Sequence, residues 1–416
     1  MAIKIEIKDV DEKGKGIGGD LFIPLAYPGD VIEAEMTSKK KKTGRMLSLV
    51  TPSLLRQPAS CKHFGECGGC LWQGMKYESQ LALKESRVRS LFGEVSRIIP
   101  SPEIFFYRNR MDFAFGPGFT LGLKNGKATV VDIEKCWLMS DASNTILLRI
   151  KKFVSERNLE SYWTGIMRHA VVREGKNINN IVLNILTSDK GTFPVDDLYA
   201  ELKDAISGVT WSINLSPADR SVGDIQKSCG ADHLMESLNG IKFRVPVQSF
   251  FQTNTRQAER LLTTVGDLLE KEEVGSILDL YSGTGSFGLY LAGRAKKVIG
   301  VEENADAVEL SRSNAELNGI GNYSAVAGRV EDVIGNLSHD YDTVIMDPPR
   351  PGVNKKILKK LGEVRPRTIV YVSCNPSTQE HDIGILKEYG YKIVSCQPLD
   401  MFPHTPHIEN VALLKY

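Results

Sequence analysis

The sequence lacks an excess of charge of either sign and lacks a long apolar run. Its 416 residues include 52 Lys and Arg against 51 Asp and Glu, so the formal net charge is only +1. Without a global basic field, any binding of a polyanion must come from local patches. No apolar run approaches the roughly 18 residues of a membrane helix, and the N-terminal stretch MAIKIEIKDV has no signal-peptide core. We therefore expect a cytoplasmic protein that does not contact a membrane.

Cysteine is also scarce, and its count is odd. Seven cysteines in a chain of this length argue against a disulfide scaffold. Hydrophobic residues make up 42% and charged residues 25%, which is ordinary globular usage and excludes a wholly disordered chain. At roughly 150 residues per domain, the length indicates about three domains.

Residues 1–57 have the pattern of a small all-β module. Apolar and charged residues alternate from Ile3 to Ile7, as in a half-buried strand. Short strands and glycine-rich turns follow, and their spacing predicts a five-stranded barrel of the oligonucleotide-binding (OB-like) type. Lys39–Lys42 and Arg45 lie on a later turn. This turn is either a solvated loop or a tip that contacts phosphates.

The rest of the chain divides into a central and a C-terminal region. Residues 58–240 combine helical and strand-like segments and predict an α+β domain. From residue 241 to 416, short β-branched runs alternate with helical segments. That alternation predicts an α/β fold, with a parallel sheet covered by helices on both faces.

A glycine-rich loop follows the first strand of the C-terminal region and opens a helix. Gly283, Gly285 and Gly288 let a backbone approach a ligand closely, and Glu302 ends the next strand, where a carboxylate can accept hydrogen bonds from ribose hydroxyls. The same glycines fit the dinucleotide fingerprint, so an NAD-dependent oxidoreductase is an alternative. Asp279, just before the loop, suits the cationic methionine moiety of S-adenosylmethionine better than a pyrophosphate.

Two proline-containing motifs follow later strands of the same sheet. Asp347-Pro-Pro-Arg and Ser373-Cys374-Asn-Pro each come directly after an apolar strand, so both lie on the ligand side of an open α/β sheet. Carbon 5 of a pyrimidine is a poor nucleophile. A thiolate that adds to carbon 6 creates an enolate that can attack the methyl group of a sulfonium. Cys374 is the candidate thiol; the bland alternative is a small buried core residue.

The thiol can leave the ring only after a base has removed the proton on carbon 5. Glu409 lies just before the last apolar run and is a candidate acceptor, with His404 and His407 as alternatives. Each of these three residues, taken alone, is more often structural than catalytic.

Five motifs in this order resemble the RNA (uracil-C5)-methyltransferase family, over nearly the whole chain. They are Phe250-Phe-Gln-Thr-Asn254, Asp279 to Phe287, Asp347-Pro-Pro-Arg350, Ser373-Cys-Asn-Pro376 and His404-Thr-Pro-His-Ile-Glu409. The resemblance implies a class I methyltransferase domain of Rossmann-like fold that uses S-adenosylmethionine and forms a covalent Cys–uracil intermediate.

The resemblance also implies roles for single residues. Cys374 would be the nucleophile and Glu409 the base, with Asp347 near both methionine and uracil. The expected contacts to cofactor or target base are Gln252, Tyr281, Gly283, Glu302 and Asp347, with Ser286 a weaker candidate.

Four cysteines form a separate candidate site. Cys61, Cys67, Cys70 and Cys136 can close a tetrahedral zinc site or hold a [4Fe–4S] cluster, and their spacing leaves both open. The family resemblance favours a [4Fe–4S] cluster with a structural role.

The resemblance implies RNA as the partner. Residues 1–57 are similar to the TRAM domain, an RNA-binding barrel, and Arg108 and Arg110 could clamp phosphates bidentately. We expect the segment 73–104 to pack as a helix on the catalytic domain, and the protein to be a monomer. The target would be extracted by base flipping.

The expected product is 5-methyluridine at position 54 of tRNA, and a uridine of 23S ribosomal RNA is the alternative target. A catalytically silent RNA-binding protein is a further alternative. Cys374 argues against this reading and against the oxidoreductase, because neither needs a thiol at that place.

Overall fold

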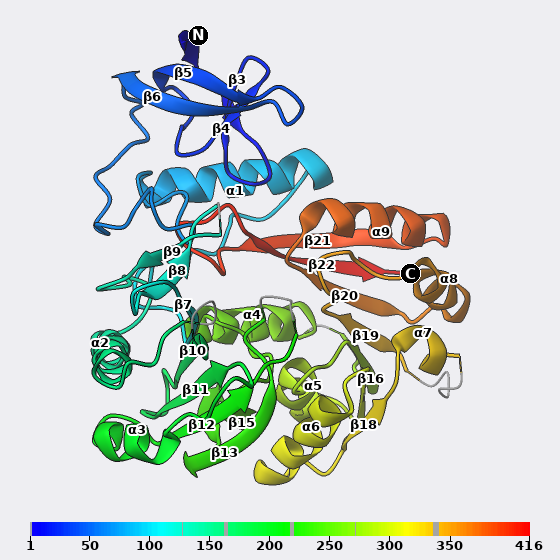
Figure 1. Cartoon of the computed structure of the whole chain (residues 1–416). Helices are drawn as coiled ribbons and strands as arrows, with labels where there is room; N and C mark the ends of the chain where they lie inside the picture. The colour runs from blue at the N-terminus through cyan, green and yellow to red at the C-terminus, as the bar shows by residue number, and fades with distance from the viewer. Residues whose placement is uncertain (1, 127, 162–164, 217–219, 271, 336–340) are drawn as a thin grey trace.

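The chain forms three sheet-based parts around one long helix (Figure 1). The N-terminal barrel lies on one side of helix α1 (Tyr77–Phe92), and the central and C-terminal parts lie on the other. The computed structural model describes residues 2–126, 128–161, 165–216, 220–270, 272–335 and 341–416.

The N-terminal part is a six-stranded sheet in the order β1-β5-β6-β4-β3-β2. Its strands are β1 (Ala2–Glu6), β2 (Asp9–Val10), β3 (Gly16–Gly18), β4 (Leu21–Ile23), β5 (Val31–Ser38) and β6 (Thr43–Thr51). The expectation of five strands was wrong by one, because the two-residue strand β2 also pairs with β3. The Lys39–Lys42 turn joins β5 to β6 and is exposed, and the neighbouring Arg45 is paired with Glu35.

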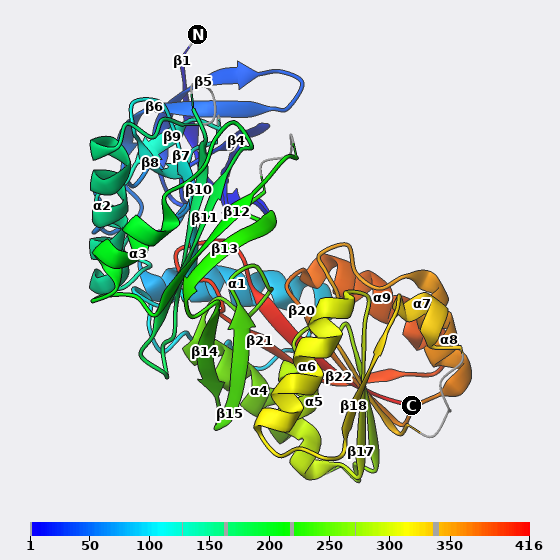
Figure 2. The same cartoon turned by 60° about the horizontal axis from the view of Figure 1, so that its bottom comes forward.

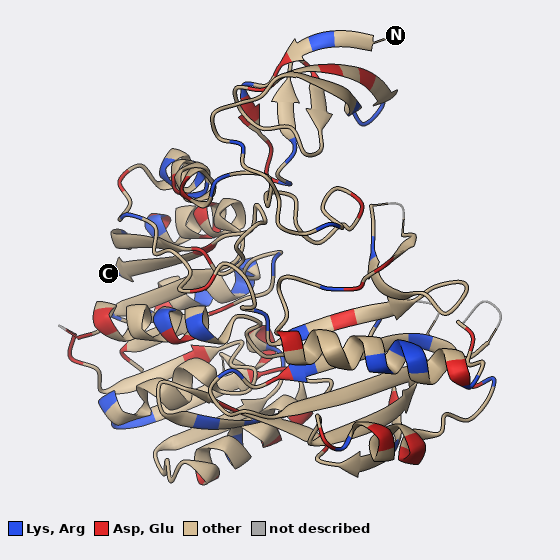
Figure 3. Cartoon of the chain, turned by 90° about the vertical axis from the view of Figure 1, so that its left-hand side faces the viewer, with Lys and Arg blue, Asp and Glu red and all other residues tan. Residues whose placement is uncertain are grey.

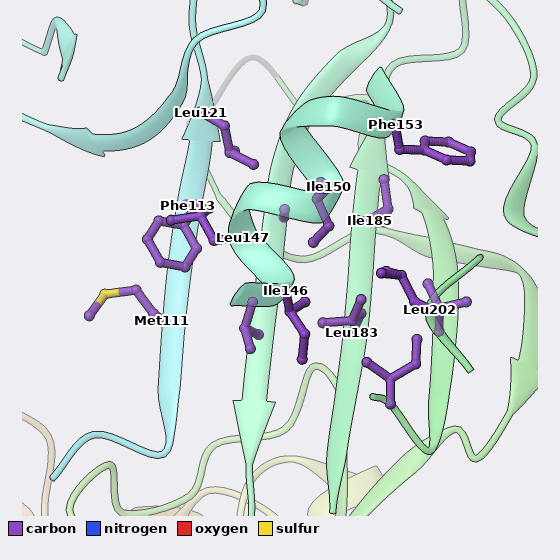
Figure 4. Packing of buried hydrophobic residues seen from close by; sticks show 14 of the residues in the cluster. Met111, Phe113, Leu121, Ile146, Leu147, Ile150, Phe153, Leu183, Ile185 and Leu202 are labelled. Atoms are coloured by element: carbon purple, nitrogen blue, oxygen red, sulfur yellow. The ribbon is translucent and has the colours of Figure 1, made fainter. Parts of the chain in front are cut away.

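The central part is a seven-stranded sheet in the order β13-β12-β11-β10-β7-β8-β9, in which only β11 and β12 are parallel. Its elements are β7 (Arg110–Phe115), β8 (Leu121–Lys124), β9 (Val130–Asp132), α2 (Asp141–Glu156), β10 (Met167–Glu174), β11 (Ile181–Thr187), α3 (Val195–Leu202), β12 (Gly208–Ile213) and β13 (Asp224–Gly230). The apolar stripe of α2, which includes Ile146, Ile150 and Phe153, packs on Leu183 and Ile185 of the sheet (Figure 4).

The C-terminal part begins with a hairpin and a helix and continues as an α/β sheet. The hairpin is β14 (His233–Leu238) and β15 (Ile241–Pro246), followed by α4 (Thr255–Leu268). The sheet and its helices are β16 (Ser276–Leu280), α5 (Ser286–Leu291), β17 (Lys297–Glu302), α6 (Ala305–Leu317), β18 (Tyr323–Ala327), α7 (Val330–Val333), β19 (Thr343–Met346), α8 (Lys355–Val364), β20 (Thr368–Ser373), α9 (Pro376–Glu388), β21 (Lys392–Leu399) and β22 (Glu409–Lys415), with a 3-10 turn at Ala292–Arg294.

The strand order of this sheet is β18-β17-β16-β19-β20-β22-β21. Strands β16 to β20 are parallel, and β22 runs antiparallel between β20 and β21. Strands such as β19 and β20 are entirely buried, because helices α4 to α6 cover one face and α7 to α9 the other (Figure 2). The predicted α/β class is confirmed, and the antiparallel strand distinguishes this sheet from an all-parallel dinucleotide fold.

Two connections join the parts. Helix α1 packs against α9 and β21 of the C-terminal part. The hairpin β14–β15 crosses the expected boundary at residue 240, and its side chains Leu234, Phe243 and Val245 pack in the core of the C-terminal sheet. Among the described residues, no helix has both the length and the apolarity needed to cross a membrane. Charged residues of both signs are spread over the surface (Figure 3).

Candidate active site

The strand order places the candidate residues at one edge of the C-terminal sheet. The chain reverses its direction of winding between β16 and β19, and ligands of open α/β sheets bind beyond the carboxyl ends of the strands at such a point. The segments that follow β16, β19 and β20 carry the glycine loop, Asp347 and Cys374. Three motifs that are far apart in the sequence therefore meet at this edge.

The strand ladder brings Cys374 next to Glu409. Ser373, the last residue of β20, pairs with Asn410 of the antiparallel strand β22. The residue after Ser373 therefore lies beside the residue before Asn410, and these two are Cys374 and Glu409. Glu409 is buried, with 4% of its surface exposed, whereas Cys374 is half-buried and open to solvent. A carboxylate and a thiol thus lie together, and only the thiol is open to the outside.

Asp347 and Gln252 complete this group from two other elements. The Nε2 atom of Gln252 donates to Oδ2 of Asp347 at 3.5 Å. Behind Gln252, the Nδ2 atom of Asn109 donates to the Gln252 carbonyl at 2.8 Å. Asn109 lies in the segment that precedes β7, so the central part fixes the backbone from which Gln252 reaches the edge. No local pattern in the sequence indicates this role of Asn109.

Side chains of α9 fasten the loops that carry Asp347 and Cys374. The Arg350 carbonyl accepts hydrogen bonds from Asn375 Nδ2 at 3.2 Å and Thr378 Oγ1 at 3.3 Å. Gln379 donates to the Tyr371 carbonyl at 2.7 Å and accepts from Asn410 Nδ2, also at 2.7 Å. The two loops and the start of β22 are therefore held as one unit.

Burial and mutual repulsion raise the pKa of every acid in this group. Burial, with the charges of Glu409 and Asp347, raises the pKa of the Cys374 thiol to about 11, while Arg350 opposes the shift. Burial raises the pKa of Asp347 to about 7. Burial, and then Asp347, raise the pKa of Glu409 well above its ordinary value. The group therefore favours a cationic ligand, which would lower all three pKa values.

The glycine loop and Glu302 lie on the other side of the same edge. The oxygens of Glu302 accept from the backbone N–H groups of Gly283 at 3.1 Å and Asn304 at 2.9 Å. Gly283 has φ +53° and Gly285 φ +85°, left-handed conformations that favour glycine. The Ser286 hydroxyl lies 3.5 Å from that of Thr284, at the first residue of α5.

Asp279 lies beneath this loop. Its Oδ2 accepts from the Gly288 N–H at 2.9 Å. Its Oδ1 is buried and has no hydrogen-bond partner within the described part of the chain. Burial, with a smaller contribution from Asp347 and Glu302, raises the pKa of Asp279 to about 8. A buried acceptor of this kind fits an ammonium or sulfonium ligand.

Three other candidates point elsewhere. Tyr281 packs on the core under α7 to α9, so its ring lies on the opposite side of the sheet from α4 to α6. His404 is buried, stacks on Phe105 with ring centroids 4.6 Å apart and accepts at Nδ1 from Gln80, so it lies against α1. His407 Nδ1 accepts from Arg350 at 3.3 Å. Burial lowers the pKa of both histidines to about 4, which makes them weak bases beside Glu409.

The four clustered cysteines line a second cavity, of about 260 Å³, in the central part. Its lining includes Cys61, Cys67, Cys70 and Cys136 together with Arg108.

Backbone contacts shape this cavity from two segments of the chain. Gly68 N donates to the Lys124 carbonyl at 3.3 Å, and Cys136 N donates to Asn144 Oδ1 of α2 at 2.7 Å. The Gly69 N–H points at the Cys67 sulfur at 3.4 Å. Burial, followed by the neighbouring thiols, raises the pKa of Cys70 to about 12. Within the described ranges, no group of three or more His, Cys, Asp or Glu side chains could hold a metal ion as it stands.

The two arginines expected to bind phosphate lie in different surroundings. Arg110 makes a two-pronged ion pair with Asp112, with distances of 2.7 and 3.0 Å. Arg108 lines the cysteine cavity, and its Nε is buried without a hydrogen bond to any described residue. Their role toward RNA stays a prediction.

Comparison with known proteins gives a consistent picture. The model of the family described as tRNA (Uracil-5-)-methyltransferase matches residues 196–416. The chain is 40% identical over 418 residues to the tRNA (uracil(54)-C(5))-methyltransferase of Pyrococcus furiosus, covering 98% of both proteins. It is 36% identical to the 23S rRNA (uracil(747)-C(5))-methyltransferase of Pyrococcus horikoshii, covering 100% of this chain and 99% of that protein.

A solved structure agrees with these matches. The Pyrococcus abyssi tRNA (uracil-54, C5)-methyltransferase, in complex with S-adenosyl-L-homocysteine, superposes with a TM-score of 0.86 at 34% identity, over 99% of this chain and 100% of that one. The resemblance found in the sequence is therefore confirmed, and it removes the oxidoreductase alternative. The chain belongs to the tRNA (uracil-5-)-methyltransferase family.

Proposed function

We propose that this protein transfers the methyl group of S-adenosylmethionine to carbon 5 of uridine 54 in tRNA, through a covalent bond between Cys374 and carbon 6 of the uracil. The observation that carries the proposal is the pairing of Ser373 with Asn410, which brings the Cys374 thiol beside the Glu409 carboxyl at the ligand edge of the sheet.

The reaction needs three actions from the side chains at this edge. Cys374, as a thiolate, adds to carbon 6, and the electron pair of the C5–C6 double bond moves toward carbon 5 and the carbonyl at carbon 4. Carbon 5 then takes the methyl group, and S-adenosylhomocysteine leaves. Glu409 removes the remaining proton from carbon 5, the C5–C6 double bond re-forms, and the bond to Cys374 breaks.

The raised pKa values indicate that binding of the methyl donor would itself ionise the side chains that the reaction needs. In the free protein, Cys374 has a pKa of about 11 and is held as a thiol near neutral pH. The positive sulfonium beside Asp347 and Glu409 would lower the pKa of the thiol and of both carboxyls. Binding of the methyl donor would therefore favour the thiolate and carboxylate forms that the reaction needs.

The donor would lie between the glycine loop and Asp347. Glu302 can still accept hydrogen bonds from the ribose hydroxyls of the donor. Gly283 and Ser286 belong to the loop whose backbone would lie against the donor. The orphaned Oδ1 of Asp279 fits the methionine ammonium. Gln252 and Asp347 would face methionine or uracil. Tyr281 is assigned to the same edge only through the family motif, because its ring packs toward α7 to α9.

We assign the target to tRNA because relatives of 37 to 40% identity over 98% of the chain are named tRNA (uracil(54)-C(5))-methyltransferases. A 23S rRNA uridine is the second candidate, because a relative of 36% identity over the whole chain acts on uracil 747 of 23S rRNA. The decisive experiment incubates unmodified tRNA and 23S rRNA fragments with labelled donor and maps the labelled nucleotide. Label on neither RNA would overturn the proposed function, and label on rRNA alone would reassign the target.

We also propose that the cysteine cavity holds a [4Fe–4S] cluster. The donor set fits, because four thiols and no carboxylate line one cavity of about 260 Å³. In a tetrahedral zinc site with Zn–S bonds of 2.3 Å, the sulfurs stand about 3.8 Å apart. The described thiols do not form a single-ion site of this kind, so the proposal of a [4Fe–4S] cluster rests on the four-thiol lining and on the family motif. The cluster would tie the 61–70 segment to Cys136 and have no part in the transfer.

RNA binding would be shared by the first two parts. We propose that residues 1–57 act as a TRAM-like domain whose exposed Lys39–Lys42 turn contacts the phosphate backbone. Residues 58–240 would grip the folded RNA, and residues 241–416 would receive the flipped base. We also propose that the protein acts as a monomer in the cytoplasm.

A further inference from the structure

Among the described residues, one almost fully buried ion pair lies outside the groups that the reaction uses. The Nζ atom of Lys84 in α1 is 2.5 Å from Oδ1 of Asp400, and these two side chains are 1% and 0% exposed. Lys84 also donates to the Phe402 carbonyl at 3.1 Å, and the Phe402 N–H donates back to Asp400 Oδ1 at 3.2 Å. The ammonium therefore closes a small ring of contacts with the segment after β21.

This segment, residues 401–404, is held by outside donors at every carbonyl. Lys84 donates to Phe402, and the Tyr107 hydroxyl donates to Pro403 at 3.2 Å. Further donors to this backbone are Asn254 Nδ2, at 3.1 Å from the Met401 carbonyl, and Trp72 N, at 2.9 Å from the His404 carbonyl. Three of the four donors come from residues 72–107, which lie before β7, the first strand of the central sheet in the chain.

Gln80, one turn before Lys84 on α1, adds a further anchor. Its Oε1 accepts from the His404 N–H at 2.8 Å. Its Nε2 donates to the Met75 and Trp72 carbonyls. His404 has φ +67°, an unfavourable conformation for a residue other than glycine. A loop fixed in such a conformation by several external bonds has one arrangement rather than many.

The held segment connects directly to the candidate base. Leu399, the residue before Asp400, is the ladder partner of Glu409, and the chain returns from residue 404 to Glu409 within five residues. Lys84 therefore holds Asp400, which follows the ladder partner of Glu409, and also Phe402, which lies at the start of the loop that leads to Glu409. A full burial of two charges costs desolvation energy that an apolar pair of similar volume would avoid, so stability alone does not explain the pair.

We propose that Lys84 of α1 is a positioning residue for the proton-accepting carboxylate Glu409, acting through Asp400 and the Phe402 carbonyl. The inference rests on the proposed function, in which Glu409 removes the carbon 5 proton and thereby lets the bond between Cys374 and carbon 6 break. It assigns to a helix outside the catalytic domain the control of the last chemical step.

The test separates the two halves of the reaction in Lys84→Met. The measurements are the rate at which protein–RNA adduct forms, the rate of tritium release from tRNA labelled at carbon 5 of uridine, and the thermal unfolding temperature. Adduct should form at the wild-type rate, while tritium release falls on the order of 10- to 100-fold, as expected for a displaced catalytic group. The share of protein held as adduct should rise accordingly. A proportional fall of both rates, or no change in either, would overturn the proposal.

Two further variants keep the test decisive. Arg89→Met removes a positive charge from the same helix, but Arg89 is half-exposed and pairs only with Glu85 of α1 among its recorded ion pairs, so both rates should stay as in the wild type. Lys84→Met combined with Asp400→Asn leaves no lone buried charge. This double variant should regain the unfolding temperature and still release tritium slowly. Recovery of full turnover would mean that the pair is merely structural.

The wild type serves as the reference for the proposed function itself. Wild-type protein that forms no adduct with tRNA or 23S rRNA would contradict the covalent mechanism. Normal adduct formation by the wild type, together with Lys84→Met behaving like Arg89→Met, would contradict only the role of Lys84.

Discussion

The proposed catalytic edge, which is the edge of the C-terminal sheet that carries Cys374 and Glu409, and the cysteine cavity gather their thiols in different ways. At the edge, Cys374 and Glu409 lie at the ends of neighbouring strands, and the Ser373–Asn410 pair of the ladder sets their separation. In the cavity, three thiols come from the loop at 61–70 and the fourth from the loop before α2. Among the described residues, a hydrogen bond from the Glu134 N–H to Nε2 of His63, at 3.3 Å, joins those two loops.

This difference has a physical consequence. A position set by a sheet ladder persists without any ligand, because the hydrogen bonds of the ladder hold it. A position set by two loops has little to hold it except the group that the loops bind together. We therefore expect the catalytic edge to depend on its side chains for chemistry alone, and the cysteine cavity to depend on its side chains for folding.

The largest effect should follow Cys374→Ala. Loss of the nucleophile removes the covalent route, so turnover should fall on the order of 10⁴-fold or more, while the unfolding temperature stays unchanged. Cys229→Ala is the matched control, because Cys229 lies on the edge strand β13 of the central sheet. Methyl transfer and trapping by 5-fluorouridine RNA measure the outcome. Trapping that survives in Cys374→Ala would exclude the assignment of the nucleophile.

Glu409→Gln should slow the last step of the reaction and leave the earlier steps intact. The amide cannot accept the proton, so product release should slow by about 10²- to 10⁴-fold, while the thiol still adds to the ring. The covalent protein–RNA complex should therefore accumulate on a denaturing gel. Release of product at the normal rate would show that another group takes the proton.

The chemistry at the catalytic edge was predictable, because each motif carries its own signal. Cys374 and Asp347 each follow a β-branched strand, with a proline two residues after Cys374 and directly after Asp347, so sheet topology alone places both on the ligand side. Glu409 was harder to assign, since its partner strand is antiparallel and only the register with β20 brings it beside Cys374.

The supports of the edge could not be predicted in the same way. Lys84 has the sequence context of an exposed helical lysine, and nothing local indicates that Asp400, more than 300 positions later, buries it. The packing of hairpin β14–β15, which spans residue 240, was hidden for a related reason, because the apolar face of a hairpin does not reveal which core it joins. His404, flagged as a possible base, instead fixes a loop against α1 through Gln80. Such roles depend on contacts between residues far apart in the sequence, and the local sequence pattern does not predict these contacts.

A cysteine substitution in the cavity should lower the stability of the protein, whereas a substitution at the catalytic edge should lower its activity. Cys70→Ser should remove iron and sulfide from anaerobically purified protein and lower the unfolding temperature by at least about 5 °C, while the affinity for S-adenosylhomocysteine stays unchanged. Cys229→Ser provides the matched control and should keep its iron. Metal analysis, visible absorption and thermal unfolding check the prediction. Zinc in place of iron would overturn the cluster.

The smallest effect concerns how the edge responds to pH. Asp279 and Asp347 have pKa values of about 8 and about 7 in the free protein, so both carry protons at pH 6. A cationic donor binds their ionised forms, and each proton it must displace costs about tenfold in affinity per pH unit below the pKa. Affinity for S-adenosylmethionine should therefore rise at least about tenfold from pH 6 to pH 8.

Calorimetry in two buffers of different ionisation enthalpy checks this and counts the protons released. S-adenosylhomocysteine lacks the sulfonium charge and provides the internal control, since it should release fewer protons and change less in affinity. In Asp279→Asn one of the two titrating carboxyls is gone, so the dependence between pH 7 and pH 8 should flatten. Equal pH dependence for both ligands would mean that the sulfonium does not sit among these carboxylates. In that case the donor would not change the ionisation of Cys374 and Glu409, and only the strand ladder would prepare these two residues for the reaction.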